Sequence, residues 1–419
     1  MRLNYGKTLV LGLGFFGISL SWSIYNSYVP IFLSDLLKDA AYRTTLVGLI
    51  MTFDNIAAIT LQPYFGALSD RTWTRVGRRM PFLLAGVPVA AVFFALIPVT
   101  RFALGAMIPV IIVMNIAMTA FRAPTVALMP DITPSPLRSK ANGIINFMGG
   151  LGALLAFFAF SQLFKVSPSL PFVVTSALMI VILLVLLRTI REPRDMGGGE
   201  ADGGKKEESV GIVQAMGEVL ADQDKSALCL LLAIFFWFVG WSGIEALFTL
   251  YGVEVWGMTP AAASFVLGFF SLSFLVFAIP SGFIATAIGR RRTILAGIVG
   301  LSLMLLAMTF ARPGLTLTAL LLVGGVAWAL ININSYPMVV DMTSAAKIGA
   351  YTGLYYFFSA LAAIVAPPVF GWFMDVLGKH ALFPCAFASF AVAFALMLGV
   401  RRGEAVGSAP ASQETSATA

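Results

Sequence analysis

Twelve apolar runs, each 19 to 28 residues long, divide this chain from one end to the other. An α-helix rises about 1.5 Å per residue, so about 20 apolar residues cross the roughly 30 Å hydrocarbon core of a bilayer. The sequence therefore predicts an all-α membrane protein with twelve transmembrane helices. The runs cover 7–33, 46–69, 81–99, 105–128, 141–164, 170–189, 227–251, 261–288, 293–311, 315–340, 349–374 and 380–400.

The composition supports a membrane protein and argues against an enzyme. Of the 419 residues, 59% are hydrophobic and 11% are charged, whereas soluble domains carry about 25% charged residues. The single histidine, His380, and the two cysteines form no metal-ligand cluster and no activated nucleophile pair. We therefore expect no catalytic residues, no metal and no cofactor.

The basic residues are distributed asymmetrically between the two sides of the predicted helices. Of the 27 Lys and Arg, Arg122 lies inside a run, six lie in the loops of one side, and the other 20 lie on the opposite side with both termini. Cytoplasmic segments carry such an excess of Lys and Arg. The charge therefore predicts cytoplasmic termini and gives no indication of nucleic-acid binding. The six residues of the outer loops are Lys38, Arg43, Arg101, Lys165, Arg312 and Lys379.

Two pairs of similar segments indicate an internal duplication. Residues 62–79 and 282–292 are two versions of one helix–basic loop–helix pattern, and each lies between long apolar segments. Asp131-Ile132-Thr133 and Asp341-Met342-Thr343 are 210 residues apart, and each Asp has a glycine twelve residues after it. Inverted or parallel repeats of this size are typical of alternating-access transporters, with the substrate site between the halves at the membrane midplane. The sequence predicts two six-helix bundles.

The predicted bundles are joined and followed by polar segments. Residues 1–190 form the first bundle in this prediction and residues 227–402 the second. The Gly-rich, charged stretch within 191–226 is a linker, whose residues 209–224 have the spacing of a short amphipathic helix. The small, polar residues 403–419 are expected to form a disordered cytoplasmic tail.

The loop motifs resemble those of the major facilitator superfamily, whose signature is Gly-x-x-x-Asp-Arg/Lys-x-Gly-Arg-Arg/Lys. Residues 282–292 keep this spacing with Thr286 in place of the Asp. Residues 62–82 are similar to the variant motif of sucrose–proton symporters, a branch related to the glycoside–pentoside–hexuronide cation symporters. The stretches 122–131 and 138–143 also look like bacterial members of that branch. The resemblance implies uptake of a di- or oligosaccharide such as sucrose or maltose, by a monomer in the cell inner membrane.

Two departures from the related families bear on the coupling ion. Plant sucrose carriers have an Asp in the fourth span where this chain has Asn115. Sodium-coupled melibiose-type carriers have two acidic residues in the second span, at the positions of Ala58 and Gln62. Because hard cations prefer paired carboxylates, sodium coupling loses support, and the proton is the expected coupling ion.

Three ionisable residues lie well inside the predicted spans: Asp54, Arg122 and Glu245. A charge near the bilayer centre costs about 2.5–3.5 kcal/mol on insertion scales, so such residues are candidates for function. We expect Asp54 and Glu245 to carry the coupled proton, with a structural ion pair as the alternative for each. Arg122 is the candidate partner of a sugar or a carboxylate, although its depth differs from that of Asp54 by roughly 13 Å along the helices.

Amides and aromatic rings inside the predicted spans are candidates for sugar binding, because sugars present hydroxyls at their edges and apolar faces between them. Packing between helices is the alternative explanation for each. Together with the ionisable groups, the predicted substrate-binding residues are Trp22, Tyr25, Asn26, Asn115, Arg122, Asn142, Asn146, Trp241, Glu245, Trp328, Asn332, Tyr355 and Tyr356.

Charged residues at the cytoplasmic ends of the spans are expected to hold one conformation through ion pairs and helix-end dipoles. These predicted gating residues are Asp70, Arg71, Gly77, Arg78, Arg79, Asp131, Asp341, Arg290 and Arg291. They suit a symporter, but also an exporter or proton antiporter of the same fold for sugars or drugs, which is the alternative function.

Overall fold

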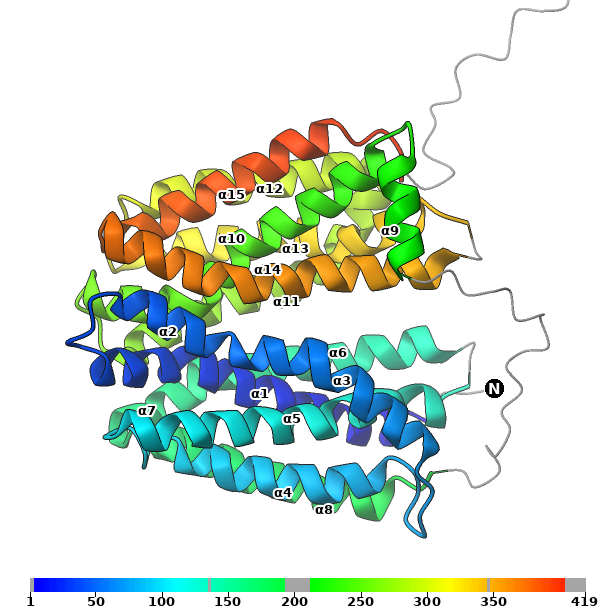
Figure 1. Ribbon diagram of the computed structural model, residues 1–419, viewed down its shortest axis with the longest axis vertical. Coiled ribbons are helices and arrows are strands. Elements are labelled where there is room, and N and C mark those ends of the chain that lie inside the picture. The colour runs from blue at the N-terminus through cyan, green and yellow to red at the C-terminus, as the bar shows by residue number, and fades with distance from the viewer. Residues whose placement is uncertain (1–3, 135–136, 193–211, 345–346, 404–419) are drawn as a thin grey trace, which may run out of the picture.

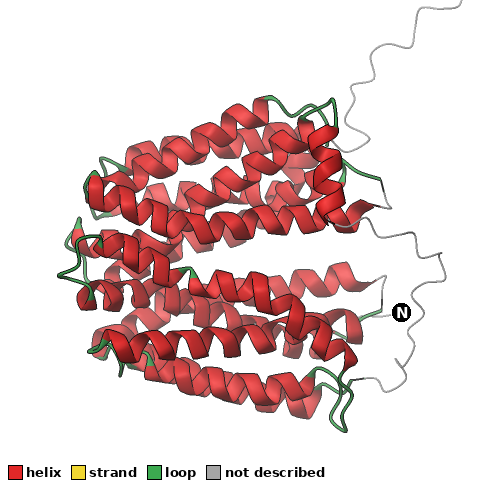
Figure 2. Ribbon diagram, in the orientation of Figure 1, coloured by secondary structure: helices red, strands yellow, loops and turns green. Residues whose placement is uncertain are grey.

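The structure is a computed structural model that describes residues 4–134, 137–192, 212–344 and 347–403. All of its regular elements over these ranges are helices (Figure 2). Eleven helical stretches of the described residues are long and apolar enough to span a membrane, and the shorter apolar helix Met80–Leu96 supplies the twelfth. The prediction of an all-α protein with twelve spanning helices is confirmed.

The helices form two bundles, which lie one above the other in Figure 1. The N-terminal bundle contains α1 (Tyr5–Leu36), α2 (Arg43–Met51), α3 (Phe53–Arg71), α4 (Met80–Leu96), α5 (Leu104–Ile132), α6 (Arg138–Leu155), the π-helix η2 (Ala156–Phe160), α7 (Ser161–Val166) and α8 (Leu170–Thr189). The C-terminal bundle contains α10 (Ser226–Glu254), α11 (Pro260–Ile288), α12 (Arg290–Met308), α13 (Leu315–Val340), α14 (Ile348–Val376), the 3-10 helix η4 (Lys379–Ala381) and α15 (Leu382–Leu398).

Helix ends follow the expected local chemistry. The Thr259 hydroxyl accepts a hydrogen bond from the Ala262 backbone N–H at 3.2 Å, and Pro260 begins α11. Gly289 separates α11 from α12 with a φ of 91°, a conformation that glycine adopts without steric cost. The start of α1, the end of α15 and the short helix α9 (Ile212–Ala221) lie at one end of the bundles, called here the terminal end (Figure 1). The opposite end is called the far end.

Two spans contain interruptions that the apolar pattern did not predict. The second span breaks between α2 and α3 at Thr52, whose hydroxyl donates to the Leu49 carbonyl at 2.7 Å. The fifth span widens into a π-helix at η2. Such interruptions occur frequently at functional sites, because they redirect side chains and free backbone groups.

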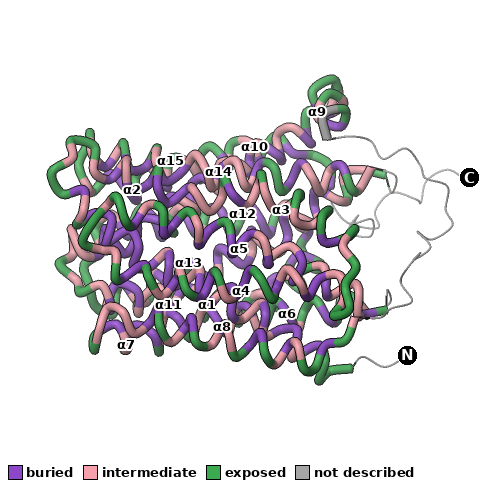
Figure 3. The backbone as a smooth tube through the Cα atoms, turned by 60° about the horizontal axis from the view of Figure 1, so that its bottom comes forward, coloured by how far each residue is buried: buried purple, intermediate pink, exposed green. Residues whose placement is uncertain are grey.

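The bundles meet mainly where α2 and α3 pack on α14, where α1 packs on α10, and where α6, η2 and α7 pack on α11. Small residues let the backbones of α2 and α14 approach closely. A Cβ atom added to Gly48 would lie 2.3 Å from the Pro367 carbonyl oxygen, and one added to Gly371 would lie 2.4 Å from that of Thr44. In Figure 3 the buried residues face neighbouring helices, and exposed residues follow the outer surface.

Helix α9 (Ile212–Ala221) packs across the terminal end of the C-terminal bundle, where the sequence predicts an amphipathic linker helix (Figure 3). Glu218 accepts a hydrogen bond of 2.7 Å from Lys347 Nζ, and this bond raises the pKa of the Lys347 ammonium. Arg402 pairs with Asp224 at 2.5 Å. The predicted flexible part of the linker at 193–211 and the predicted tail at 404–419 lie outside the described residues.

Candidate substrate and coupling site

A cavity of about 350 Å³ lies between the two bundles, and it is called here the central cavity. Its lining is mainly polar, which is unusual for a site surrounded by apolar spans. It brings together the three ionisable residues that the sequence singled out. The lining residues are Ile18, Ser19, Trp22, Ser23, Asn26, Met51, Asp54, Asn55, Arg122, Ala153, Ser242, Glu245, Ala246, Ala363 and Pro367.

A hydrogen bond crosses this cavity from one bundle to the other. Asn26 Nδ2 on α1 donates to Glu245 Oε1 on α10 at 3.4 Å. Glu245 is exposed to the cavity, whereas the helix around it is buried. A long hydrogen bond in an accessible site is easily exchanged for one to a ligand hydroxyl. A ligand that replaces this hydrogen bond would therefore contact both bundles, through Asn26 and through Glu245.

The break at Thr52 determines the surroundings of Asp54. Because α3 begins at Phe53, Asp54 lies in its first turn, where the helix dipole favours a negative charge. Asp54 Oδ1 accepts hydrogen bonds from the backbone N–H and from Nδ2 of Asn55, both at 2.7 Å. The carboxylate is thus held at a fixed place in the cavity wall.

Arg122 on α5 lines the same cavity as Asp54. No ion pair joins Arg122 to any residue that the structure describes, so the two do not form a direct pair, in agreement with their predicted difference in depth. A half-buried guanidinium that faces a cavity offers a fork of donors that can bind neighbouring hydroxyls or a carboxylate.

Trp22 also lines the central cavity, whereas Trp241 and Trp328 lie in an aromatic stack beside it. The Trp241 ring stacks on Phe270 with centroids 4.7 Å apart and on Trp328 with centroids 4.9 Å apart. Trp328 is buried, and neither Trp328 nor Trp241 lines the central cavity. Direct contact of either ring with a substrate in this cavity stays a prediction.

Tyr25 and Asn115 lie inside the N-terminal bundle, away from the lining of the central cavity. Both are buried, and neither the Tyr25 hydroxyl nor the Asn115 amide has a hydrogen-bond partner among the described residues. In this conformation their direct contact with a substrate, which the sequence predicts, has no geometric support. The sequence of α1 does not show which of the neighbours Tyr25 and Asn26 faces the cavity, because the helix is apolar around its whole circumference.

The remaining predicted substrate residues also lie outside the lining of the central cavity. Asn142 and Asn146 are exposed on α6, and the Tyr356 side chain is exposed on α14. Tyr355 is buried, and its hydroxyl lies 3.2 Å from Ser335 Oγ within the C-terminal bundle. Asn332 is half-buried on α13. Their roles stay predictions, which a different conformation of the bundles would test.

Glu254 at the far end joins the bundles, and sequence analysis missed it. Its Oε1 accepts hydrogen bonds from Ser34 Oγ at 3.0 Å and from Arg43 at 2.7 Å, and Lys379 pairs with its Oε2 at 3.4 Å. Ser34 and Arg43 belong to the N-terminal bundle. In the sequence, Glu254 is a single charge at the end of an apolar run, so it carries no signal of this role.

Asp375 adds a second link at the far end. Its carboxylate accepts hydrogen bonds from the backbone N–H groups of Thr44 and Thr45, at 3.1 and 2.8 Å, and from the Thr45 hydroxyl at 2.8 Å. A residue of one bundle thus caps the helix α2 of the other, because the first N–H groups of a helix lack intrahelical partners. Lys379 contacts both Thr44 and Asp375.

The links between bundles are confined to the cavity level and the far end. Ser27 and Ser264 form one further hydrogen bond of 3.1 Å between α1 and α11. Over the described ranges, no hydrogen bond or ion pair joins the bundles at the terminal end. Among the described residues, the terminal end is therefore the end at which polar contacts do not join the bundles.

The predicted gating residues form two networks at the terminal end, one within each bundle. The Asp131 carboxylate forms ion pairs with Arg78 at 2.5 Å and with Arg79 at 3.0 Å, and Arg79 also pairs with Asp70. In the C-terminal bundle, Asp341 pairs with Arg290. The duplicated Asp and Arg residues thus make equivalent contacts inside their own bundles. Over the described residues, none of these ion pairs joins one bundle to the other.

The other predicted gating residues have different surroundings. Arg291 donates to the Leu398 carbonyl at 2.9 Å, which ties α12 to the end of α15. Arg71 is exposed at the end of α3. Gly77 has a φ of 118°, and a Cβ atom added to it would lie 2.5 Å from Glu192 Oε1. The glycine is therefore required by backbone conformation and by the nearby acid.

Glu192 is a further residue that sequence analysis missed, and it yields a stability prediction. Its carboxylate accepts hydrogen bonds from the backbone N–H groups of Arg78, Arg79 and Met80, at 2.8, 2.9 and 3.0 Å, where α4 begins. We expect Glu192→Gln to lose about 1.5–3 kcal/mol of stability, because bonds to a charged group are about that strong. Thermal unfolding in detergent measures this, with the exposed acid Asp39→Asn as a control. Equal melting temperatures for both variants would contradict the assignment.

Comparison with known proteins identifies the fold family. The profile of the Major Facilitator Superfamily matches residues 11–367 and again residues 253–418, and the first match alone covers more than half of the chain. The chain belongs to the major facilitator superfamily. This major facilitator protein is therefore a multi-pass membrane transporter, a class that binds small-molecule substrates within the membrane.

Individual relatives cover only parts of this major facilitator protein. It is 37% identical over 82 residues to the proton-associated sugar transporter A of Homo sapiens, a match that spans 19% of this chain and 10% of that protein. It is 26% identical over 146 residues to the isoprimeverose transporter of Lactiplantibacillus pentosus, across 33% of this chain and 30% of that protein. The chain thus aligns with less than a third of the length of either relative.

A solved structure agrees over nearly the whole length. The crystal structure of the nucleoside transporter NupG superimposes with a TM-score of 0.73 at 16% identity, and covers 95% of this chain and 99% of that one. At this identity the likeness shows the fold. It confirms the arrangement of two six-helix bundles.

Proposed function

We propose that this protein is a proton-coupled symporter that takes up a sugar by alternating access. The observation that carries the proposal is the convergence of Asp54, Arg122 and Glu245, from three helices of two bundles, on one polar cavity. Charged side chains within a membrane are energetically costly, so those that are present usually serve a function. The partial likeness to a proton-associated sugar transporter supports both the sugar and the proton.

The central cavity has suitable chemistry for a hydroxylated ligand. Asn26 and Glu245 offer both a donor and an acceptor, and Arg122 offers a fork of donors. The Trp22 ring supplies an aromatic face of the kind that packs against the apolar side of a sugar ring. The cavity volume of about 350 Å³ lies within the usual range of small-molecule sites, about 300–1,000 Å³. We propose a di- or oligosaccharide such as sucrose or maltose.

We assign different tasks to the two carboxylates. Asp54 lies at a helix break near Arg122 and has no partner from the other bundle among the described residues, so it is free to exchange a proton as the cavity changes access. Glu245 bonds across the bundles to Asn26, so it couples the ligand to bundle movement. The far end would face the outside, in keeping with the charge asymmetry, and this conformation would release substrate to the cytoplasm.

The assignment of Glu245 can be tested with Asn26 as its partner. We expect Glu245→Ala to weaken sugar binding about tenfold or more, since hydrogen bonds to charged groups are worth about 1.5–3 kcal/mol. Because Asn26 and Glu245 act together, the double variant with Asn26→Ala should bind hardly less well than either single variant. Binding measured by calorimetry on all three proteins decides the matter. Additive losses would show that the two residues act separately.

The function itself is tested by uptake of radiolabelled sucrose and maltose into proteoliposomes. We expect accumulation under an inward proton gradient and none under a sodium gradient alone. Accumulation that requires sodium would overturn proton coupling. Proton-driven movement of the sugar in the opposite direction would instead establish the exporter.

A further inference from the structure

A second cavity, of about 140 Å³, adjoins the central cavity and extends into the C-terminal bundle. It is called here the apolar chamber. The two cavities share Ser23, Ala153 and Glu245 as lining residues, so they are separated by no more than these side chains. The remaining walls of the apolar chamber come mostly from α10, α11, α12 and α13 and are almost entirely apolar.

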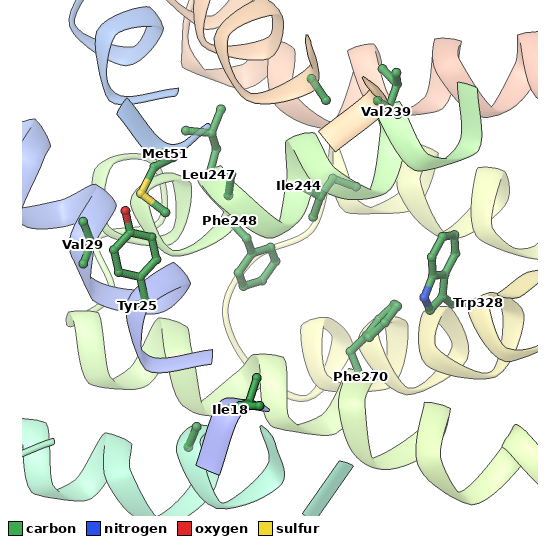
Figure 4. Packing of buried hydrophobic residues seen from close by; sticks show 14 of the residues in the cluster. Ile18, Tyr25, Val29, Met51, Val239, Ile244, Leu247, Phe248, Phe270 and Trp328 are labelled. Atoms are coloured by element: carbon green, nitrogen blue, oxygen red, sulfur yellow. The ribbon is translucent and has the colours of Figure 1, made fainter. Parts of the chain in front are cut away.

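Aromatic side chains line the apolar chamber where it meets the central cavity. Trp241 and Phe270 present stacked rings, and Phe248 lies one turn of α10 beyond Ile244. Figure 4 shows Ile244, Phe248 and Phe270 directed toward a common space between α10 and α11. Leu305 of α12 forms part of the apolar wall of the chamber. This arrangement offers flat surfaces to a flat, apolar group.

An apolar chamber of this size inside a packed helical bundle requires an explanation. Protein interiors are close packed and contain few voids larger than a water molecule. An engineered cavity of about 150 Å³ with a similar aliphatic and aromatic lining stays dry and binds benzene. The apolar chamber therefore has the volume and the lining for one six-membered aromatic ring.

We propose that the transporter also accepts glycosides with an aromatic aglycone, whose sugar occupies the central cavity and whose ring occupies the apolar chamber. This proposal rests on the proposed function, because it takes the polar part of the ligand to be a sugar. Glu245 lies at the junction, so it would contact the sugar next to the glycosidic bond. Phe270 would stack on the aglycone through the face that Trp241 does not cover, and Trp241, which is stacked between Phe270 and Trp328, would meet it with its edge.

Paired glycosides test the proposal on the purified full-length protein. The probes are the 4-nitrophenyl and methyl glycosides of glucose, galactose and xylose, with binding measured by calorimetry. For the sugar that binds, we expect the nitrophenyl glycoside to bind about tenfold tighter or more, since burying a ring of this size contributes at least that factor. Trp241 should also report the ring through quenching of tryptophan emission, which Trp241→Phe removes.

A variant that fills the chamber separates ring binding from sugar binding. Leu305→Phe should abolish the preference for the nitrophenyl glycoside and leave the methyl glycoside unaffected. Leu303→Phe on the same helix is the matched control, because Leu303 is 61% exposed on the outer surface. If Leu305→Phe does not fold, Leu321→Phe fills the apolar chamber from α13 and should have the same effect, because Leu321 does not line the central cavity.

The outcomes distinguish this proposal from the proposed function. Equal affinities for paired nitrophenyl and methyl glycosides would overturn the aromatic aglycone and leave sugar transport intact. Tight binding of adenosine or uridine without binding of nitrophenyl glycosides would also overturn it, because a nucleobase needs polar partners that the apolar chamber lacks. Failure of every glycoside and free sugar to bind would overturn the proposed function together with this inference.

Discussion

Asp54→Asn is expected to abolish proton-driven accumulation of sugar while preserving sugar exchange across the membrane. Asparagine keeps the shape of the side chain and its carbonyl oxygen can still accept from Asn55, but it cannot take up a proton. A gradient of one pH unit corresponds to about 1.4 kcal/mol, so coupling to one proton accumulates sugar about tenfold. The variant should reach no accumulation above the external concentration.

Two assays on the same proteoliposomes separate coupling from transport. Accumulation under a proton gradient measures coupling, and counterflow of radiolabelled sugar against an internal load measures exchange alone. Asp39→Asn removes an acid from an exposed loop and serves as the control, with both activities retained. Normal accumulation by Asp54→Asn would contradict the assignment, and the loss of accumulation only in Glu245→Gln would transfer the role to Glu245.

Gly371→Ala is expected to hold the far end of the transporter open. The added Cβ would lie 2.4 Å from the Thr44 carbonyl oxygen, and backbone atoms cannot move aside as a flexible side chain can. The bundles must separate there, which also breaks the bonds from Asp375 to the start of α2. Uptake should fall at least about tenfold, because the transport cycle requires the conformation that is closed at the far end and the variant populates it less.

Labelling of an introduced cysteine measures this shift directly. Ser34→Cys, with Cys229 and Cys385 replaced by serine, places a thiol at a buried far-end position opposite Glu254. Its reaction with a maleimide should be faster in Gly371→Ala. Gly349→Ala on the same helix is the control, since its added Cβ meets nothing within 4 Å. Unchanged labelling and uptake in Gly371→Ala would show that α2 and α14 do not form the far-end closure.

Much of the architecture could be predicted from the sequence because a bilayer imposes a simple rule. Each apolar run is long enough to span it, and all twelve runs form helices. The duplicated Asp131 and Asp341 also proved informative, since each binds an arginine of its own basic loop. The rarity of charge inside a membrane was sufficient to single out Asp54, Arg122 and Glu245, and the structure places all three in the lining of one cavity.

The contacts between bundles could not be predicted, because a uniformly apolar helix does not reveal which face meets its neighbour. Tyr25 and Asn26 are adjacent in sequence, yet only Asn26 reaches the cavity. Glu254 and Asp375 are single charges near span ends, where charges are common for reasons of solubility. Their meaning comes from partners about 211 to 331 residues away.

Local breaks in helices also escaped the sequence pattern. A break of one residue at Thr52 leaves the apolar run of the second span intact, so hydropathy does not detect it. It nevertheless sets the surroundings of Asp54 by creating a helix start there. The π-helix of the fifth span is hidden in the same way, and its Phe157 lines the apolar chamber.

Proton-coupled symport is tested most directly by measuring the proton movement that addition of sugar alone produces. Proteoliposomes containing the wild-type protein and a trapped pH-sensitive dye are prepared with equal pH and equal sodium on both sides, and sugar is then added outside. Proton-coupled symport predicts that the lumen becomes acidic upon addition of sugar, and that Asp54→Asn shows no acidification although sugar still enters. Sugar entry without any change in luminal pH in the wild-type protein would contradict proton-coupled symport.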